Sequence, residues 1–207
     1  RSTLTFAALN RGGSENGDAE ISELVLTAGI LSAIAGSGAS EVVFETPLGA
    51  MALEKETINK LSELAQQAGE NQDITIQISR ADSENYPDEL KELIGNRPVY
   101  DFSIMVGDKN LRDITDDSAA FTLVLDNMHE EDPSVNENQI VGAYITEDGK
   151  YELIPLSALV DGKLVIKTTH NSLYTGLHNN VQFEDVSGWP ADFIAFLAAR
   201  GVINGKG

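Results

Sequence analysis

Short runs in which apolar and polar residues alternate recur along most of the chain. Successive side chains of a strand point to opposite faces, so this alternation predicts half-buried β-strands. The alternation, or a short apolar run between turn residues, occurs at 23–29, 41–47, 73–82, 97–114, 119–126, 139–156 and 162–177. Within the sixth of these segments, Asp148-Gly149 separates two apolar runs and predicts a two-residue β-hairpin.

Helical spacing is less frequent than strand alternation. Apolar residues three or four positions apart predict an amphipathic helix over 54–68 with a charged opposite face. We also expect a helix over 87–94, a helical turn over 30–35 and a C-terminal helix over 191–200 that Gly201 stops. The sequence therefore predicts a mainly β, β-sandwich-like fold of the α+β class, with one or two helices and a short helical C-terminal segment.

Three regions of different character divide the chain. Residues 1–19 contain the glycine-rich polar run RGGSENGDA and are expected to form a flexible lead-in or linker. Residues 20–179 hold the strand signals and are expected to form a β-rich, sandwich-like surface domain. Residues 182–207 begin with aromatic residues and continue into the C-terminal helix. Arg1 is not an initiator methionine, which suggests a start inside a longer precursor.

The charge balance narrows the range of partners. Asp and Glu total 33 against 14 Lys and Arg, a formal net charge of -19. Such a chain is repelled by phosphate backbones and by anionic lipids, so neither nucleic acid nor membrane is expected as a partner. No apolar run approaches the roughly 20 residues that span a bilayer. The absence of cysteine excludes disulfides, thiolate metal sites and thiol nucleophiles.

The segment FEDVSGWPADFIAFLAARGVINGKG resembles the opening of an S-layer-homology module. The positions that carry the resemblance are Phe183, Asp185, Val186, Trp189, Ile194, Leu197, Gly201, Val202, Ile203 and Gly205. The resemblance implies a secreted, cell-wall-anchored protein of the bacterial surface, in which 182–207 supply only the first helix of a module. In that family, groups of modules bind secondary cell-wall polysaccharide, partly through their second halves. We therefore expect this polysaccharide to be a partner of the complete region and to bind this segment weakly or not at all.

The preceding domain carries a second resemblance. ETPLGAMAL at 45–53, RPVYDFSIMVGDKNLRDI at 97–114 and GKLVIKTTHNSLYTGL at 162–177 resemble a β-rich module that precedes S-layer-homology units in large Gram-positive surface proteins. That module ends in Thr-Thr-His-Phe-Ser-x-Tyr, and residues 168–174 stand at these positions.

His170 and Ser172 also resemble the His-x-Ser element of self-cleaving domains. There a serine attacks the preceding carbonyl, a histidine acts as base, and a strained turn raises the scissile amide toward the transition state. Here the cut would fall between Asn171 and Ser172. Asn171 replaces the hydrophobic residue that normally packs this turn, which argues against activity. The alternative is that the two side chains satisfy hydrogen bonds at a strand end.

The acidic segment 126–138 is a candidate calcium loop. Its carboxylates, Asp126, Glu130, Glu131 and Asp132, could hold Ca²⁺ loosely through oxygen ligands. The segment lacks the alternating Asp/Asn series and the glycine of the common calcium loop, so a solvated acidic loop is the alternative. No other cofactor is expected.

Three functional hypotheses follow. The leading one is a non-catalytic extracellular structural or spacer module of a cell-wall-anchored, S-layer-associated protein. The second is a binding module for carbohydrate or a partner protein, which an exposed aromatic or apolar patch would favour. The third is an autoproteolytic module that cleaves at Asn171–Ser172.

Overall fold

A computed structural model describes residues 2–7, 21–67, 72–110, 121–129, 131–146 and 148–205. The strands are β1 (Thr3–Ala7), β2 (Ile21–Leu26), β3 (Glu41–Thr46), β4 (Gly49–Glu54), β5 (Ile74–Ala81), β6 (Val99–Val106), β7 (Lys109–Asn110), β8 (Phe121–Leu125), β9 (Ile140–Ile145), β10 (Tyr151–Ile154), β11 (Ser157–Val160), β12 (Lys163–Thr168) and β13 (Leu173–His178). The helices are α1 (Ala28–Gly36), α2 (Lys55–Gln67), α3 (Asp88–Ile94), the 3₁₀ helix η1 (Glu137–Gln139) and α4 (Ala191–Ala199). The predicted mainly β, α+β fold is confirmed.

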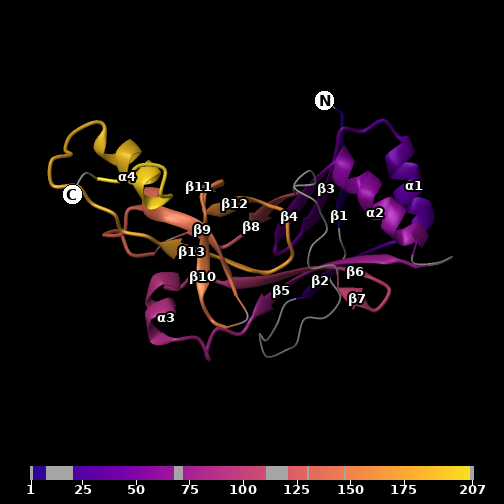
Figure 1. The fold of residues 1–207 in the computed structure, drawn as a ribbon, viewed down its shortest axis with the longest axis horizontal. Coiled ribbons are helices and arrows are strands. Elements are labelled where there is room, and N and C mark those ends of the chain that lie inside the picture. Colours follow the sequence, from indigo (N-terminus) through magenta and orange to yellow (C-terminus); the bar gives the residue numbers. More distant parts are fainter. Residues whose placement is uncertain are drawn as a thin grey trace.

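The strands form two sheets. The first has the order β1-β3-β4-β8-β12-β11, and the second has the order β10-β9-β13-β6-β5-β2, with β7 added to β6. Most neighbours are antiparallel, but β1 runs parallel to β3. Figure 1 shows α1 and α2 at one end of the long axis and α3 and α4 at the other end.

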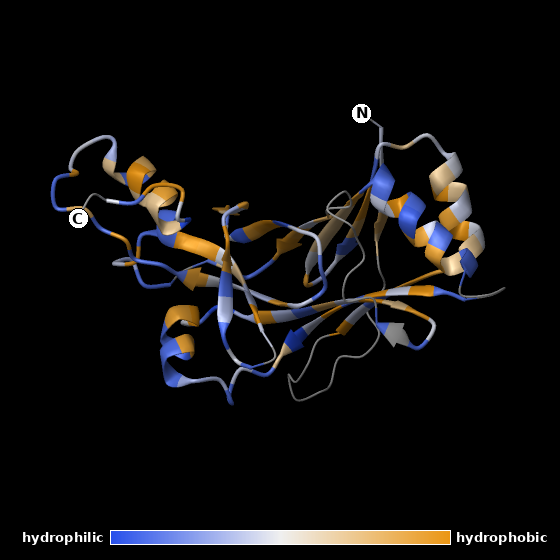
Figure 2. Ribbon diagram, in the orientation of Figure 1, coloured by the Kyte–Doolittle hydropathy of each residue, from blue (hydrophilic) through white to orange (hydrophobic). Residues whose placement is uncertain are grey.

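One hydrophobic core lies between the two sheets. Val42, Leu53, Leu123 and Ile166 of the first sheet share a buried cluster with Ile76, Phe102 and Ile104 of the second. Alternation along each strand places these side chains on the inner faces, as predicted, because removing apolar area from water favours the layered arrangement. Figure 2 shows apolar and polar residues alternating along several strands.

The two N-terminal helices close one end of this core. In α2 the predicted apolar face is buried at Ile58, Leu61 and Ala65. The expected helical turn over 30–35 is a full helix, α1, because the hydroxyl of Thr27 accepts a hydrogen bond from the Ile30 N–H and caps it. Leu31 and Ile34 of α1 join the same core.

Two expectations differ from the structure. Thr3–Ala7, expected to belong to the flexible lead-in, form β1 and pair with β3 from Thr3↔Glu41 to Ala7↔Glu45; residues 8–20 lie outside the described residues. The hairpin at Asp148-Gly149 exists, but its connection is longer than two residues, because Ile145 pairs with Tyr151. Thr146 N–H donates to the Lys150 carbonyl and closes this longer loop.

Candidate functional site

The predicted His-x-Ser element lies where the chain passes from one sheet to the other. β12, in the first sheet, ends at Thr168, and β13, in the second sheet, begins at Leu173. Leu173 pairs with Asp101 of β6 and Ile145 of β9. The segment between them therefore spans the layers, and its polar groups must find partners near the core.

A cluster of three polar side chains fixes this crossover. Thr168 Oγ1 lies 3.0 Å from His170 Nδ1 and 2.9 Å from the Tyr174 hydroxyl. The Tyr174 hydroxyl lies 2.9 Å from His170 Nδ1 and donates to the His170 carbonyl. Thr168 and Tyr174 are buried, and the Tyr144 ring packs edge-on against the imidazole with centroids 4.5 Å apart. The imidazole therefore serves as a hydrogen-bond partner for buried hydroxyls.

Ser172 takes part in a different set of contacts. Its hydroxyl donates to the Ile145 carbonyl at 3.3 Å, and its own carbonyl accepts from the Phe102 N–H at 3.0 Å. No hydrogen bond joins Ser172 to His170, although both residues are described. The predicted nucleophile, Ser172, and the predicted base, His170, are close in sequence, but their side chains bond different partners in the structure.

Backbone strain is also missing from the candidate cleavage bond. Among the described residues other than glycine, positive φ angles occur at Asn127 and Asp161, not at 170–172. Asn171 and Ser172 line an open pocket of about 270 Å³ with Asp101 and Asn110. Water can therefore reach the Asn171–Ser172 bond. Attack on this bond by the Ser172 hydroxyl is not favoured, because His170 makes no hydrogen bond to that hydroxyl and none of residues 170–172 has a positive φ.

The two tyrosines of the cluster are held in their neutral form. Burial is the largest cause that raises the pKa of Tyr174 above its usual value. A hydrogen bond with Glu152, more than burial, raises the pKa of Tyr144 to about 12. Neutral phenols donate hydrogen bonds and do not act as bases, which fits a structural cluster.

The C-terminal helix is joined to the body of the protein by Arg200. Its guanidinium donates to the carbonyls of Ser157 at 2.8 Å, Asn138 at 2.9 Å and Ile140 at 2.9 Å. Ser157 belongs to β11 of the first sheet and Ile140 to β9 of the second. One side chain, only 3% exposed, therefore connects the helix to both sheets. It also bonds the Phe196 carbonyl and lies 3.5 Å from the centre of the Phe196 ring.

An apolar stripe, defined as Trp189, Phe193, Leu197 and Val202, runs along α4 and the turns on either side of it. Trp189 is 94% exposed, Phe193 65% and Val202 59%. Phe193 and Leu197 are four residues apart on α4 and so share one face, and Trp189 lies in the turn just before the helix. Val202 completes the stripe because its N–H bonds the Leu197 carbonyl across Gly201, whose φ of 67° ends the helix as predicted. Exposed apolar surface of this kind favours contact with another molecule.

A pocket of about 270 Å³ lies between α4 and the loops around η1. Polar side chains from both sides line it, among them Asn136, Gln139, Gln182 and Asp192. Asn136 Nδ2 lies 3.4 Å from Asp192 Oδ1 across the pocket, and Gln139 Nε2 donates to the Val181 carbonyl at 2.8 Å. The side-chain amides of Asn136, Gln139 and Gln182 could therefore bond a polar ligand. The shape of the pocket depends on how α4 packs against the loops around η1.

Phe183, Asp185 and Val186, which belong to the segment that resembles an S-layer-homology module, lie before the helix. Phe183 is half-buried, and a Cβ at Gly205 would lie 2.7 Å from its ring, so the residues after the helix return to this part of the chain. The Val186 N–H donates to the Phe183 carbonyl at 3.3 Å, whereas Asp185 is exposed. The motif therefore forms one folded unit.

Asp126, Glu131 and Asp132, the candidate calcium residues that the structure describes, are not gathered into a site. Asp126 lies 2.9 Å from Lys163 Nζ, and Asp132 accepts hydrogen bonds from the backbone and hydroxyl of Ser134. Those bonds to Ser134 lower the pKa of Asp132. Glu131 is described without such a partner, and Glu130 lies outside the described residues. In the part of the chain that the structure describes, no three acidic or histidine side chains group in a way that could hold a metal ion.

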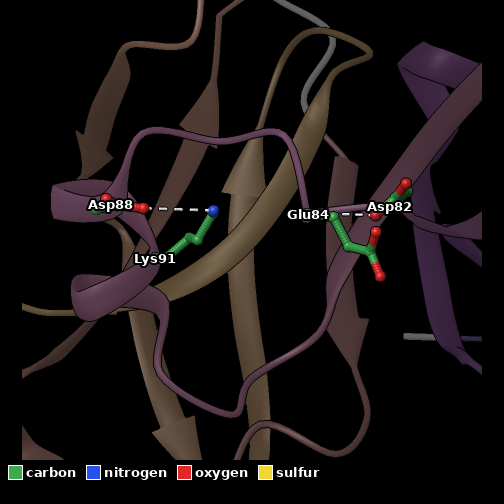
Figure 3. Close-up of polar contacts among 4 residues, drawn as sticks. All are labelled: Asp82, Glu84, Asp88 and Lys91. Carbon is green, nitrogen blue, oxygen red and sulfur yellow. Dashed lines mark hydrogen bonds and ion pairs between the residues drawn. The ribbon is translucent and has the colours of Figure 1, made fainter.

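A second acidic segment precedes α3 and is shown in Figure 3. There the Glu84 N–H donates to Asp82 Oδ1 at 2.8 Å, and Lys91 Nζ lies 3.4 Å from Asp88 Oδ1. These are local turn and helix contacts of exposed groups. They assemble no catalytic pair.

The role of Arg200 was not anticipated from the sequence. A cation in the last turn of a helix is favourable in general, so its position alone suggested nothing more than a helix end. The available signal was an arginine that follows the apolar run 193–199, directly before the stop glycine. Its carbonyl partners outside the helix are 43 to 62 residues away and could not be paired with it from the sequence.

Comparisons with protein-family models, with curated proteins and with solved structures gave no match to this chain. Among the described helices, none combines the length and the apolar character needed to cross a bilayer.

Proposed function

We propose that the chain is a non-catalytic structural module of an extracellular, cell-wall-anchored protein, in which a β-sandwich positions an adjoining anchoring segment. The observation that carries this proposal is the attachment of α4 to both sheets through Arg200. A guanidinium that satisfies carbonyls of two sheets and of its own helix restricts rotation of that helix about the sandwich. The likeness of 183–205 to the start of an S-layer-homology module supports the anchoring role.

The shape and charge of the molecule support a spacer. Figure 1 places α4 and the C-terminal end far from α1 and α2 along the longest axis. The net charge of -19 keeps such a module soluble and repels it from other acidic polymers at short range. A rigid, acidic body of this kind holds neighbouring regions apart without needing a ligand.

Surface labelling tests the proposal. Antibodies raised against the 207-residue chain should label intact cells that produce the parent protein. Chemical extraction of the secondary cell-wall polysaccharide should release the labelled protein. Labelling that requires permeabilised cells, or that survives this extraction unchanged, would overturn the proposal.

The second candidate function is a binding module, and the exposure of Trp189 favours it. Trp189 is the one tryptophan of the chain, so fluorescence excited selectively in tryptophan reports on the apolar stripe alone. If the stripe or the adjoining pocket binds carbohydrate, titration with purified cell-wall polysaccharide should shift the emission to the blue as the indole loses water. Gln182→Ala, on the pocket side, distinguishes ligand entry into the pocket from stacking on the indole.

Self-cleavage at Asn171–Ser172 is the third candidate, and the geometry supports it least. The non-catalytic proposal expects the intact mass of the purified chain to stay unchanged during prolonged incubation. The Ser172→Ala variant should behave identically. Two fragments whose masses meet at Asn171–Ser172, present in the wild type and missing from the variant, would establish the autoproteolytic function instead.

A further inference from the structure

The outer edge of β1 is open within the described residues. β1 is the first strand of its sheet and pairs there only with β3, along one side. Its other side presents backbone N–H and carbonyl groups that no described strand pairs. Such an edge is a template for a further strand. Figure 1 shows β1 beside β3, in the half of the molecule that holds α1 and α2.

The other three sheet edges carry features that hinder strand addition, and β1 does not. β2 contains Glu23 and β10 contains Glu152. On β11, the Ser157 carbonyl accepts a hydrogen bond from Arg200 and is therefore occupied. Residues 2–7 contain no charged side chain, although the chain carries a net charge of -19. Charges on edge strands act against pairing between molecules, so β1 is the edge most open to it.

The side chains of β1 would also gain from a neighbouring strand. Leu4 and Phe6 pack against the core, and the Phe6 ring stacks on Phe44 with centroids 5.8 Å apart. Both side chains are nevertheless only half-buried, because the sheet ends beside them. A strand added at this edge would cover the remaining apolar surface.

We infer that β1 pairs with β1 of a second copy of the chain, antiparallel about a two-fold axis at Thr5. This register places Thr5 opposite Thr5, and Leu4 opposite Phe6 of the other copy. Thr–Thr and aromatic–aliphatic pairs are favourable across strands. The sequence TLTFA thus complements itself, and a two-fold dimer needs such a self-complementary contact.

Charge distinguishes this contact from the other exposed apolar surface. The apolar stripe on α4 has exposed carboxylates nearby, at Glu184, Asp185 and Asp192. Two copies meeting there would bring like charges together, which disfavours self-association. Pairing of two β1 strands brings no charged side chains of β1 together. The two copies still repel each other, because each carries a net charge of -19. Added salt should therefore strengthen the dimer.

Sedimentation equilibrium over a range of chain concentrations tests the dimer. We expect a concentration-dependent dimer that tightens from low to high sodium chloride. Thr5→Lys places two like charges directly opposite each other and should raise the dissociation constant by roughly fivefold or more. Val160→Lys, on the other edge strand of the same sheet, is the matched control and should leave it unchanged. Circular dichroism establishes that both variants fold.

A monomer under all conditions would overturn the inference. So would a dimer that persists in Thr5→Lys, or one that is lost only when Trp189 of the apolar stripe is changed to Ser. In the last case the two copies would meet through α4.

Cross-linking gives an independent test because the chain contains no cysteine. A single Thr5→Cys substitution sets two sulfurs across the two-fold axis, at a strand spacing compatible with a disulfide. Mild oxidation should convert this variant to a covalent dimer on a non-reducing denaturing gel. Val160→Cys should convert much more slowly, and equal rates for the two variants would contradict pairing at β1.

Discussion

At the scale of single residues, the crossover between the two sheets depends on hydrogen bonds that satisfy buried hydroxyls. Thr168 and Tyr174 lie in the interior, where an unpaired hydroxyl is costly, and His170 offers them its ring Nδ1 as a hydrogen-bond partner and its carbonyl as an acceptor. This explains why a histidine two residues before a serine can be structural. Its Nδ1 contacts the hydroxyls of Thr168 and Tyr174, whereas the Ser172 hydroxyl bonds the Ile145 carbonyl.

Removing the phenol of Tyr174 should therefore destabilise the fold. Tyr174→Phe leaves the His170 carbonyl without its donor, and we expect a loss of about 1–3 kcal/mol in the free energy of unfolding. Urea denaturation measures it. Tyr151→Phe, at an exposed position of β10, is the control and should change the free energy by less than about 0.5 kcal/mol. Equal effects of the two variants would contradict the structural role of the cluster.

Alkaline pH should unfold the protein through its tyrosines. The folded-state pKa of Tyr144 is raised from 10.0 to about 12, and burial raises the pKa of Tyr100 and Tyr174 as well. A raised pKa means that the fold favours the protonated phenol, so stability is complete below pH 10 and falls as pH rises through about 12. Phenolate absorbance and circular dichroism followed together should change in the same pH range. Complete ionisation of the tyrosines in a folded chain would contradict this.

At the scale of elements, the two ends of α4 differ in how deeply they are buried. Ala198, Ala199 and Arg200 are buried at its C-terminal end, whereas Phe193 in its first turn and Trp189 in the turn before it are exposed. The helix is thus buried most deeply in its last turn. Arg200 is the polar anchor of this buried end.

Arg200→Met should release α4 from the sandwich. The substitution keeps much of the side-chain volume but leaves three carbonyls of the body without their donor, at a cost of about 2–4 kcal/mol. Hydrogen exchange should accelerate in α4 and at the start of β9. Lys167→Met, which removes an exposed cation near Glu54, should leave α4 protected. Unchanged exchange in Arg200→Met would show that apolar contacts hold the helix.

At the scale of the whole molecule, excess negative charge opposes a compact state. Bringing a net charge of -19 into the volume of a folded domain costs electrostatic free energy that the extended chain avoids. The two-sheet core has to outweigh this repulsion. Ion pairs such as Lys163 with Asp126 offset it only locally.

Stability should consequently rise with ionic strength. Sodium chloride screens repulsion between exposed carboxylates, so the urea midpoint should increase from low to moderate salt at neutral pH. Measurement on the Thr5→Lys variant separates this effect from salt-dependent association of copies. A midpoint that falls or stays constant would indicate that specific ion pairs outweigh the net repulsion.

The sequence by itself determined which faces of many elements are buried. Period-two alternation located β3, β5, β6 and β8, helical spacing located α2, and Gly201 stopped α4 as expected. These features are local, because the side-chain directions of a strand or helix follow from its own backbone. The mainly β class followed from them.

Only the tertiary structure decided which elements and groups meet. The parallel pairing of β1 with β3, the engagement of His170 with Thr168 instead of Ser172, and the contacts of Arg200 with both sheets join groups whose partners lie elsewhere in the fold. A sequence pattern specifies that a side chain is buried or polar, but not its partner. The partner is selected by the packing of the two layers, which must satisfy every buried polar group at once.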